Sequence, residues 1–206
     1  MNNFFGENGL LYRFVNKMVD LLVLNIVYIV TCIPIVTIGS ANVALYDVTL
    51  KMCKNEDGYI IKQYLKSFKS NFKKATVIWI FFLLIFSLLG LDFLLIGNSE
   101  LEIRMLVLSA VFAAFVLVMI PFSYVAPQIA VFENTIRNYI KNAVIISMTR
   151  IIYTIPIVTL NLIPFVLLLM GGIWLEIGSR IMIMLGWSGI AYLNSFLFHK
   201  VFARYK

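Results

Sequence analysis

Long runs of apolar residues without a single charge alternate with short charged segments along this chain. The runs cover residues 21–46, 75–91, 105–128, 151–175 and 181–198. Each is close to the roughly 20 residues that an α-helix needs to cross the hydrocarbon core of a bilayer. The pattern lacks the alternating strands of about 10 residues that indicate an outer-membrane barrel. It therefore predicts an all-α, polytopic helical membrane protein.

The composition supports this class. Hydrophobic residues make up 62% of the 206 residues and charged residues only 13%, which is too little charge for a soluble domain of this size. We expect one transmembrane domain, 1–206, with four long transmembrane helices, an N-terminal broken helical hairpin and amphipathic cytoplasmic helices. In chain order, the expected elements are a broken hairpin at 19–54, a cytoplasmic amphipathic helix at 56–74, and membrane spans at 75–97, 104–127, 151–174 and 181–198.

The distribution of charge predicts the orientation. The net charge is +7, and most basic residues fall in four segments: before the first run, between the first and second, between the third and fourth, and at the C-terminus. The two other connections, 98–104 and 175–180, contain acidic residues. Because basic loops are retained in the cytoplasm, we expect the four basic segments, and both termini, on the cytoplasmic side.

The first apolar run, 21–46, is basic on both flanks, which predicts a turn within it. Pro34 removes a helical N–H donor. Gly39 permits backbone conformations that other residues resist, and Ser40 suits the N-cap of a helix that starts at Ala41. We therefore expect two antiparallel arms, and the candidate structural turn residues are Pro34, Thr37, Gly39 and Ser40.

A single straight span is the alternative for this run. Residues 19–38 supply the roughly 20 residues that one crossing needs. In that case the N-terminus lies outside and residues 41–54 form a surface helix. The similar string "TIPIVTLN" at 154–161 needs no turn, because Arg150 precedes it and an acidic connection follows, so one kinked span suffices.

A stripe of lysines marks the segment between the first two runs. Lys62, Lys66, Lys69 and Lys73 follow the spacing i, i+4, i+7, i+11 of one helical face, and an apolar face lies about 90° away at Ile61, Leu65, Phe68 and Phe72. Such a helix lies in the headgroup layer, where anionic lipid attracts each lysine by about 1 kcal/mol. These lysines are the candidate lipid- or partner-facing residues. Proximity to the membrane explains them without nucleic-acid binding.

The sequence contains no arrangement of residues that is typical of an active site. His199 is the single histidine, and neither a metal-binding spacing nor a phosphate-binding loop occurs. We therefore expect no enzyme activity and no cofactor. Asp92 is expected to pair with Arg104 or Arg180, with proton coupling as the alternative. The pair Gly171–Gly172 is expected to serve close helix packing, and five polar residues within the runs predict hydrogen bonds between helices: Asn25, Thr37, Asn161, Asn194 and Ser195.

The N-terminal third carries a family resemblance. Its residues are Asn25, the strings "IPIVTIGSANVALYDVTLK" (33–51) and "EDGYIIKQYLKSFKSNFKKAT" (56–76), and Trp79; "APQIAVFEN" (126–134) also fits. In these residues the chain resembles the bacterial YesL-like family of membrane proteins, a domain of unknown function. The resemblance implies a bacterial cytoplasmic membrane and an association with carbohydrate ABC importers. It carries no site residue over to this chain.

These observations lead to one expected function and one alternative. The expected function is a non-enzymatic integral membrane protein that is accessory to carbohydrate ABC-type uptake. Its expected partners are a bilayer with anionic headgroups and components of a sugar ABC transporter. The alternative is an autonomous small-solute transporter or channel, because a membrane helix interrupted by proline and glycine is typical of transporter binding sites.

Overall fold

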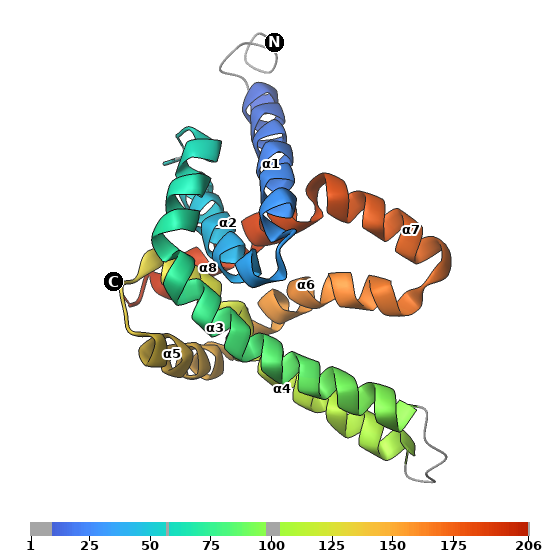
Figure 1. Ribbon diagram of the computed structural model, residues 1–206. Coiled ribbons are helices and arrows are strands. Elements are labelled where there is room, and N and C mark those ends of the chain that lie inside the picture. The colour runs from blue at the N-terminus through green and yellow to red at the C-terminus, as the bar shows by residue number, and fades with distance from the viewer. Residues whose placement is uncertain (1–9, 57, 98–103, 206) are drawn as a thin grey trace.

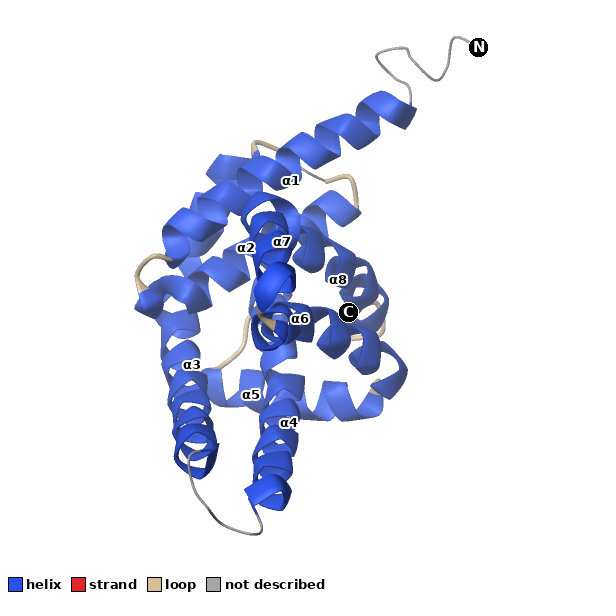
Figure 2. Ribbon diagram, turned by 90° about the vertical axis from the view of Figure 1, so that its right-hand side faces the viewer, coloured by secondary structure: helices blue, strands red, loops and turns tan. Residues whose placement is uncertain are grey.

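Every regular element is a helix in the computed structural model, which describes residues 10–56, 58–97 and 104–205 (Figures 1 and 2). This confirms the predicted all-α class. The elements are α1 (Leu10–Cys32), a short 3-10 turn (Ile35–Thr37), α2 (Ile38–Cys53), α3 (Ile60–Gly97), α4 (Arg104–Val131), α5 (Ile136–Thr149), α6 (Ile151–Met170), α7 (Gly172–Ile181), a π-helical stretch (Met182–Gly186) and α8 (Trp187–Phe202).

Within the residues that the structure describes, four helical segments are long and apolar enough to cross a membrane. They are Phe14–Cys32, Ile60–Ile96, Arg104–Val131 and Gly172–Phe202. The helices α5 and α6 meet the same criterion only as a pair, which is bent by 111°. The number of long apolar helices fits a multi-pass membrane protein. The set differs from the prediction, because α1 qualifies by length and α6 does not qualify by itself.

The helix α3 differs most from its prediction. The expected amphipathic helix at 56–74 and the expected span at 75–97 form one continuous helix of 38 residues. The change from a lysine-rich to an apolar sequence at Lys73 and Lys74 indicates where the environment of the helix changes from polar to apolar. It does not mark a helix end, because neither proline nor glycine interrupts the chain from Ile60 to Leu89.

The connection between the spans predicted at 151–174 and 181–198 also differs from the prediction in its position along the chain. The helix α6 ends at Met170, and the chain turns at Gly171 and Gly172, whose φ angles are +62° and +52°. Glycine adopts this left-handed conformation without steric cost. Among the described residues, no atom apart from those of the chain neighbours lies within 4 Å of a Cβ placed on either glycine, so the expected role in helix packing is wrong. The acidic segment 175–180 is helical and belongs to α7.

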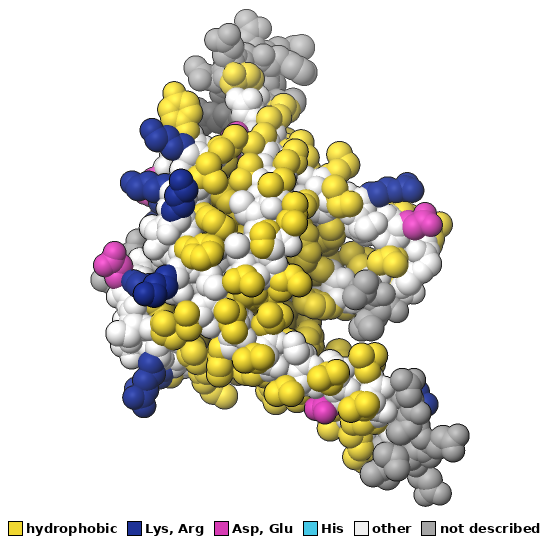
Figure 3. Space-filling view, viewed as in Figure 1, with side chains coloured by type: hydrophobic (Ala, Val, Ile, Leu, Met, Phe, Trp, Pro, Cys, Tyr) yellow, Lys and Arg dark blue, Asp and Glu magenta, His cyan; other side chains and the backbone are white. Residues whose placement is uncertain are grey.

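The core gathers around α2, which lies against α3, α4 and α8. Aromatic rings join these helices: the ring of Phe198 lies 5.7 Å from that of Tyr46 and 5.1 Å from that of Tyr124. The Tyr124 hydroxyl lies 2.6 Å from the Thr154 hydroxyl, which connects α4 to α6. Away from this core, α3 and α4 extend together as a long antiparallel pair (Figure 1). The face of the molecule in Figure 3 is largely apolar, which suits contact with lipid.

Candidate functional site

The chain reverses between α1 and α2. Pro34 is extended, with φ −76° and ψ 119°, and it separates the two helices. The Tyr28 hydroxyl donates to Asn42 Oδ1 at 3.0 Å, and further from the break the Lys17 ammonium donates to the Met52 carbonyl oxygen at 3.2 Å. These two contacts require α1 and α2 to run antiparallel from the break.

Side chains satisfy the backbone carbonyls that the break leaves free. The Thr37 hydroxyl lies 2.5 Å from the carbonyl oxygen of Thr31 and 2.6 Å from that of Pro34. From α3, the indole N–H of Trp79 donates to the carbonyl oxygen of Ile35 at 2.7 Å. The side chains of Ile33 and Ile35 point outward and are 75% and 61% exposed. The turn thus presents an apolar surface and keeps its polar groups paired, which irregular backbone in a bilayer needs.

Two of the candidate turn residues have other roles than expected. Gly39 lies within the first turn of α2 and has an ordinary helical backbone. A Cβ there would lie 2.5 Å from the Trp79 Cβ and 2.6 Å from the Ala75 carbonyl oxygen, so this glycine allows α2 and α3 to touch. Ser40 is not the N-cap, because α2 begins at Ile38; its hydroxyl donates to the Thr37 carbonyl oxygen at 2.9 Å.

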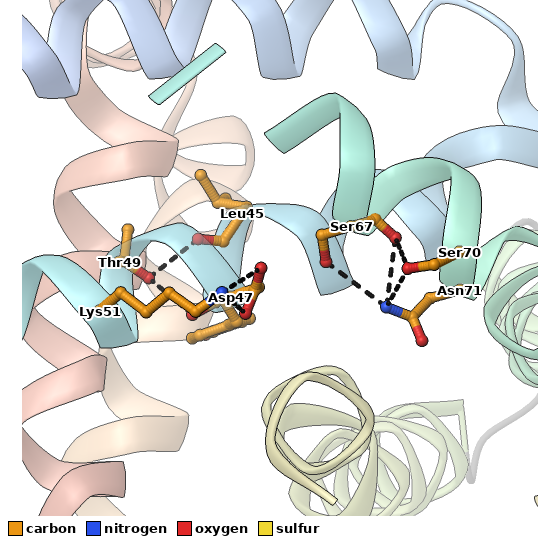
Figure 4. A network of polar contacts seen from close by, with 8 residues as sticks. Leu45, Asp47, Thr49, Lys51, Ser67, Ser70 and Asn71 are labelled. Carbon is orange, nitrogen blue, oxygen red and sulfur yellow. Dashed lines mark hydrogen bonds and ion pairs between the residues drawn. The ribbon is translucent and has the colours of Figure 1, made fainter. Parts of the chain in front are cut away.

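The lysine stripe lies on the first half of α3. Lys62, Lys66, Lys69 and Lys73 are all exposed, and Tyr59, Ile61 and Leu65 are exposed beside them. The opposite, buried face of α3 packs on the core. There the Asn71 side-chain amide donates to the Ser67 carbonyl oxygen at 3.1 Å (Figure 4). Across from it on α2, the carboxylate of Asp47 binds the ammonium of Lys51 at 2.9 Å.

Contacts join the basic parts of the chain in two pairs. Lys17 on α1 donates to Asn55 Oδ1 at 2.8 Å. The Ser195 hydroxyl donates to that of Thr49 at 2.9 Å, which holds α8 beside the last turns of α2. At the C-terminus, the hydroxyls of Thr149 and Tyr205 lie 3.4 Å apart.

Hydrogen bonding from Thr149 and the nearby positive charge of Arg150 lower the pKa of Tyr205. In Figure 3 most of the Lys and Arg side chains in view lie along the left edge, a few lie on the right, and the apolar middle of this face is free of them. The contacts above make neighbours of the basic segments in two pairs.

The acidic residues on α3 and α7 do not pair as expected. Arg180 contacts Glu176 on the same helix, with 3.8 Å between the charged atoms. Asp92 is exposed on α3, and it forms no ion pair with Arg104 or Arg180. The connection 98–103 lies outside the described residues. Within the described part of the chain, no group of three or more His, Cys, Asp and Glu residues is arranged to hold a metal ion.

A cavity of about 780 Å³ opens beside the break. Six helices contribute to its wall: α1, α2, α3, α4, α6 and α8. Two polar pairs reach it, the Tyr28–Asn42 pair and, on the other side, Tyr46 with Asn161. The Asn194 amide donates to Asn161 Oδ1 at 2.9 Å and lies 3.4 Å from the Tyr46 hydroxyl, so it holds the second pair in place.

A π-helical stretch borders this cavity and is held by a single asparagine. Asn25 on α1 is fully buried, and its amide donates to the carbonyl oxygens of Met182 and Ile183 at 3.1 and 2.7 Å. Its Oδ1 accepts the backbone N–H of Ser188 at 3.0 Å. A π-bulge displaces backbone groups from their regular helical partners, and here one side chain binds three of them. Trp187, which follows the bulge, lines the cavity.

The comparison with known families bears on this same region. The family described as "Protein of unknown function, DUF624" matches residues 21–93. The chain is similar to that family over this part, which contains Asn25, the break, the lysine stripe and Trp79. No curated protein and no solved structure matches the chain. The match thus gives this region a family likeness without giving it a function.

Sequence reasoning missed the cavity. Its polar residues come from several helices, among them α1, α2, α4 and α6, and no short motif connects them. One signal was present, since Asn25, Asn161 and Asn194 are polar residues within apolar runs. The predicted hydrogen bonds between helices are confirmed for these three asparagines.

Proposed function

We propose that this chain is a non-enzymatic, multi-pass protein of the bacterial cytoplasmic membrane that is accessory to carbohydrate uptake through an ABC-type transporter. The observation that carries the proposal is the exposed lysine stripe beside Tyr59, Ile61 and Leu65. This surface suits anionic headgroups and a partner protein at the same membrane face. The resemblance noted from the sequence supplies the carbohydrate context.

The proposed topology places both termini in the cytoplasm and makes residues 19–54 a hairpin that enters the bilayer and returns. Two observations support it. Contacts join the basic segments in two pairs, and positive-inside retention assigns these segments to the cytoplasm. The break carries apolar side chains outward and has its free carbonyls bound by Thr37 and Trp79. An ordinary loop in water has no need of such internal pairing.

Affinity purification of the full chain in mild detergent tests the accessory role. We expect the subunits of a sugar ABC transporter to copurify. Replacing Lys62, Lys66 and Lys69 with glutamate should reduce that recovery, because it reverses the charge of the proposed contact. The matched control replaces Arg104 and Arg180, at the other end, with glutamate and should leave the recovery unchanged. Purification without any transporter subunit, under conditions that preserve known transporter complexes, contradicts this role.

An autonomous small-solute transporter is the second candidate function. The cavity favours it, because it adjoins a helix break inside a membrane bundle, as transporter sites do. The purified chain in liposomes separates the two candidates. Flux of a sugar or another small polar solute by the purified protein alone supports transport and overturns the accessory role, and the absence of flux together with copurification supports the accessory role.

A further inference from the structure

The cavity beside the break has walls that suit hydrocarbon. The rings of Phe86 and Phe122 lie 5.4 Å apart in its wall, and those of Phe115 and Phe165 lie 5.6 Å apart. Among the described residues, none that lines it is charged. A volume of about 780 Å³ lies within the range of about 300–1,000 Å³ for ligand sites. Apolar cavities stay free of water, so this space favours an apolar occupant.

The few polar groups in the wall are neutral. The Tyr28 hydroxyl donates to the Asn42 amide oxygen, and Tyr46 and Asn161 form a second pair that the Asn194 amide joins by binding both. Hydroxyl and amide groups both donate and accept hydrogen bonds, so they can bind a hydroxyl of a ligand. They cannot neutralise a charge, and moving an unpaired charge out of water is strongly unfavourable.

The cavity opens toward the apolar surface. Ile33 and Phe165 line it and are 75% and 41% exposed, so the opening has an apolar rim. On α3 the cavity is lined by Trp79, Leu83 and Phe86. Leu84 and Leu88 on the same stretch of helix are 61% and 63% exposed and face outward. This level of α3 lies in the run predicted to span the hydrocarbon, so a ligand reaches the opening from within the bilayer.

We propose that the cavity binds an uncharged lipid, a hydrocarbon chain with a hydroxyl-bearing head, that enters sideways from the membrane. The chain lies against the phenylalanine rings, and the head reaches the Tyr28–Asn42 and Tyr46–Asn161 pairs. This site goes beyond the accessory role and does not depend on it. Binding of the lipid displaces no charged group and forms hydrogen bonds only with neutral partners.

Tryptophan fluorescence offers a direct test. Trp79 and Trp187 line the cavity, whereas Trp174 lies on α7 and is 55% exposed. In a Trp174→Phe background, the remaining fluorescence therefore reports on the cavity. The probes are a monoacylglycerol with a brominated chain, which is uncharged, and an alkyl sulfate with the same brominated chain, which is permanently anionic. Both are added to the full chain in phosphatidylcholine nanodiscs.

We expect the monoacylglycerol to quench the cavity tryptophans saturably and at a lower mole fraction than the alkyl sulfate. Tyr28→Phe, which removes one hydroxyl, should raise the half-saturating mole fraction roughly threefold to tenfold, which is the loss of affinity expected when one hydrogen bond is removed. Tyr192→Phe, on α8 but outside the cavity wall, should leave it unchanged. Quenching that rises in proportion to the mole fraction, equally for both probes, overturns the proposal.

A second pair of variants tests whether the lipid occupies the cavity, because one of them reduces the volume of the cavity. Ala126 lines the cavity, whereas Ala110 on the same helix is exposed and does not. Ala126→Leu should reduce saturable quenching by the monoacylglycerol, and Ala110→Leu should preserve it. Equal saturable quenching in both variants, each eluting as a single species in size-exclusion chromatography, assigns the lipid to another surface and also overturns the proposal.

Discussion

Asn25 on α1 accepts the backbone N–H of Ser188 on α8 at its Oδ1, at 3.0 Å, and the Ser188 hydroxyl joins the same two helices again by donating to the Leu21 carbonyl oxygen at 2.8 Å. Asn25 and Ser188 are both fully buried. Through this contact the first helix of the chain holds the π-helical stretch of the last. The two ends of the sequence therefore depend on each other for the shape of the cavity wall.

Asn25→Leu should destabilise the protein strongly. The substitution keeps the size of the side chain but leaves the Met182 and Ile183 carbonyls and the Ser188 N–H without their partner. Each buried unpaired group costs about 1–3 kcal/mol. Thermal unfolding followed by size-exclusion chromatography in detergent should show a clearly lower midpoint. Asn138→Leu, at an exposed position on α5, is the control and should differ little from the wild type. An unchanged midpoint for Asn25→Leu contradicts the role of Asn25 in holding the π-helical stretch.

Gly39→Val should lower the yield of folded protein more than Gly90→Val. At Gly39 the new side chain meets Trp79 and the Ala75 carbonyl group, whereas no atom lies within 4 Å of a Cβ at Gly90. Separating α2 from α3 also weakens the bond from Trp79 to the break. The measurement is the fraction of expressed protein that elutes as a single species. Equal yields for the two variants argue against close packing at Gly39.

Replacing Lys62, Lys66, Lys69 and Lys73 with glutamine should weaken the association of a peptide of residues 56–75 with anionic vesicles. Each lysine contributes about 1 kcal/mol near an anionic surface, so four substitutions have a large combined effect. Binding to neutral vesicles should change little, since Ile61 and Leu65 are retained. Equal binding of both peptides to anionic vesicles at low salt removes the electrostatic part of the argument.

A cysteine introduced at Asn3, after Cys32 and Cys53 are replaced with serine, should be protected from an impermeant maleimide in intact cells. The hairpin leaves position 3 in the cytoplasm, whereas a single crossing places it on the outer side of the membrane. Ser70, exposed on the basic half of α3, serves as the protected control, and Ser179, exposed on α7, as the labelled one. Ready labelling at position 3, with Ser70 protected, selects the single span.

The apolar runs were sufficient to predict the helical class and the multi-pass character, because their length follows from the thickness of a bilayer. Helix ends were harder to predict. Lys73 and Lys74 indicate where the surroundings change, but a helix continues through such a change when nothing in the backbone stops it. Acidic residues at 175–180 similarly mark a water-facing surface without marking a turn.

The two glycine sites show why a sequence alone cannot assign such roles. Gly39 was expected to form a turn and instead lies against α3, while Gly171 was expected to pack and instead forms a turn. Glycine serves either purpose, and the choice depends on which helices come together. The cavity could not be predicted for the same reason, since Tyr28, Asn42 and Asn161 meet only after folding.

The continuity of α3 has a mechanical consequence. At about 1.5 Å per residue, its 38 residues form a rod of about 57 Å, much longer than the roughly 30 Å hydrocarbon core. No residue within it offers a hinge until Gly90. A force that tilts the lysine-bearing half therefore moves Trp79, and with it the break and the cavity mouth, in the same step. Through the bond from the Trp79 indole to the Ile35 carbonyl oxygen, α3 transmits a tilt of its lysine-bearing half to the turn between α1 and α2.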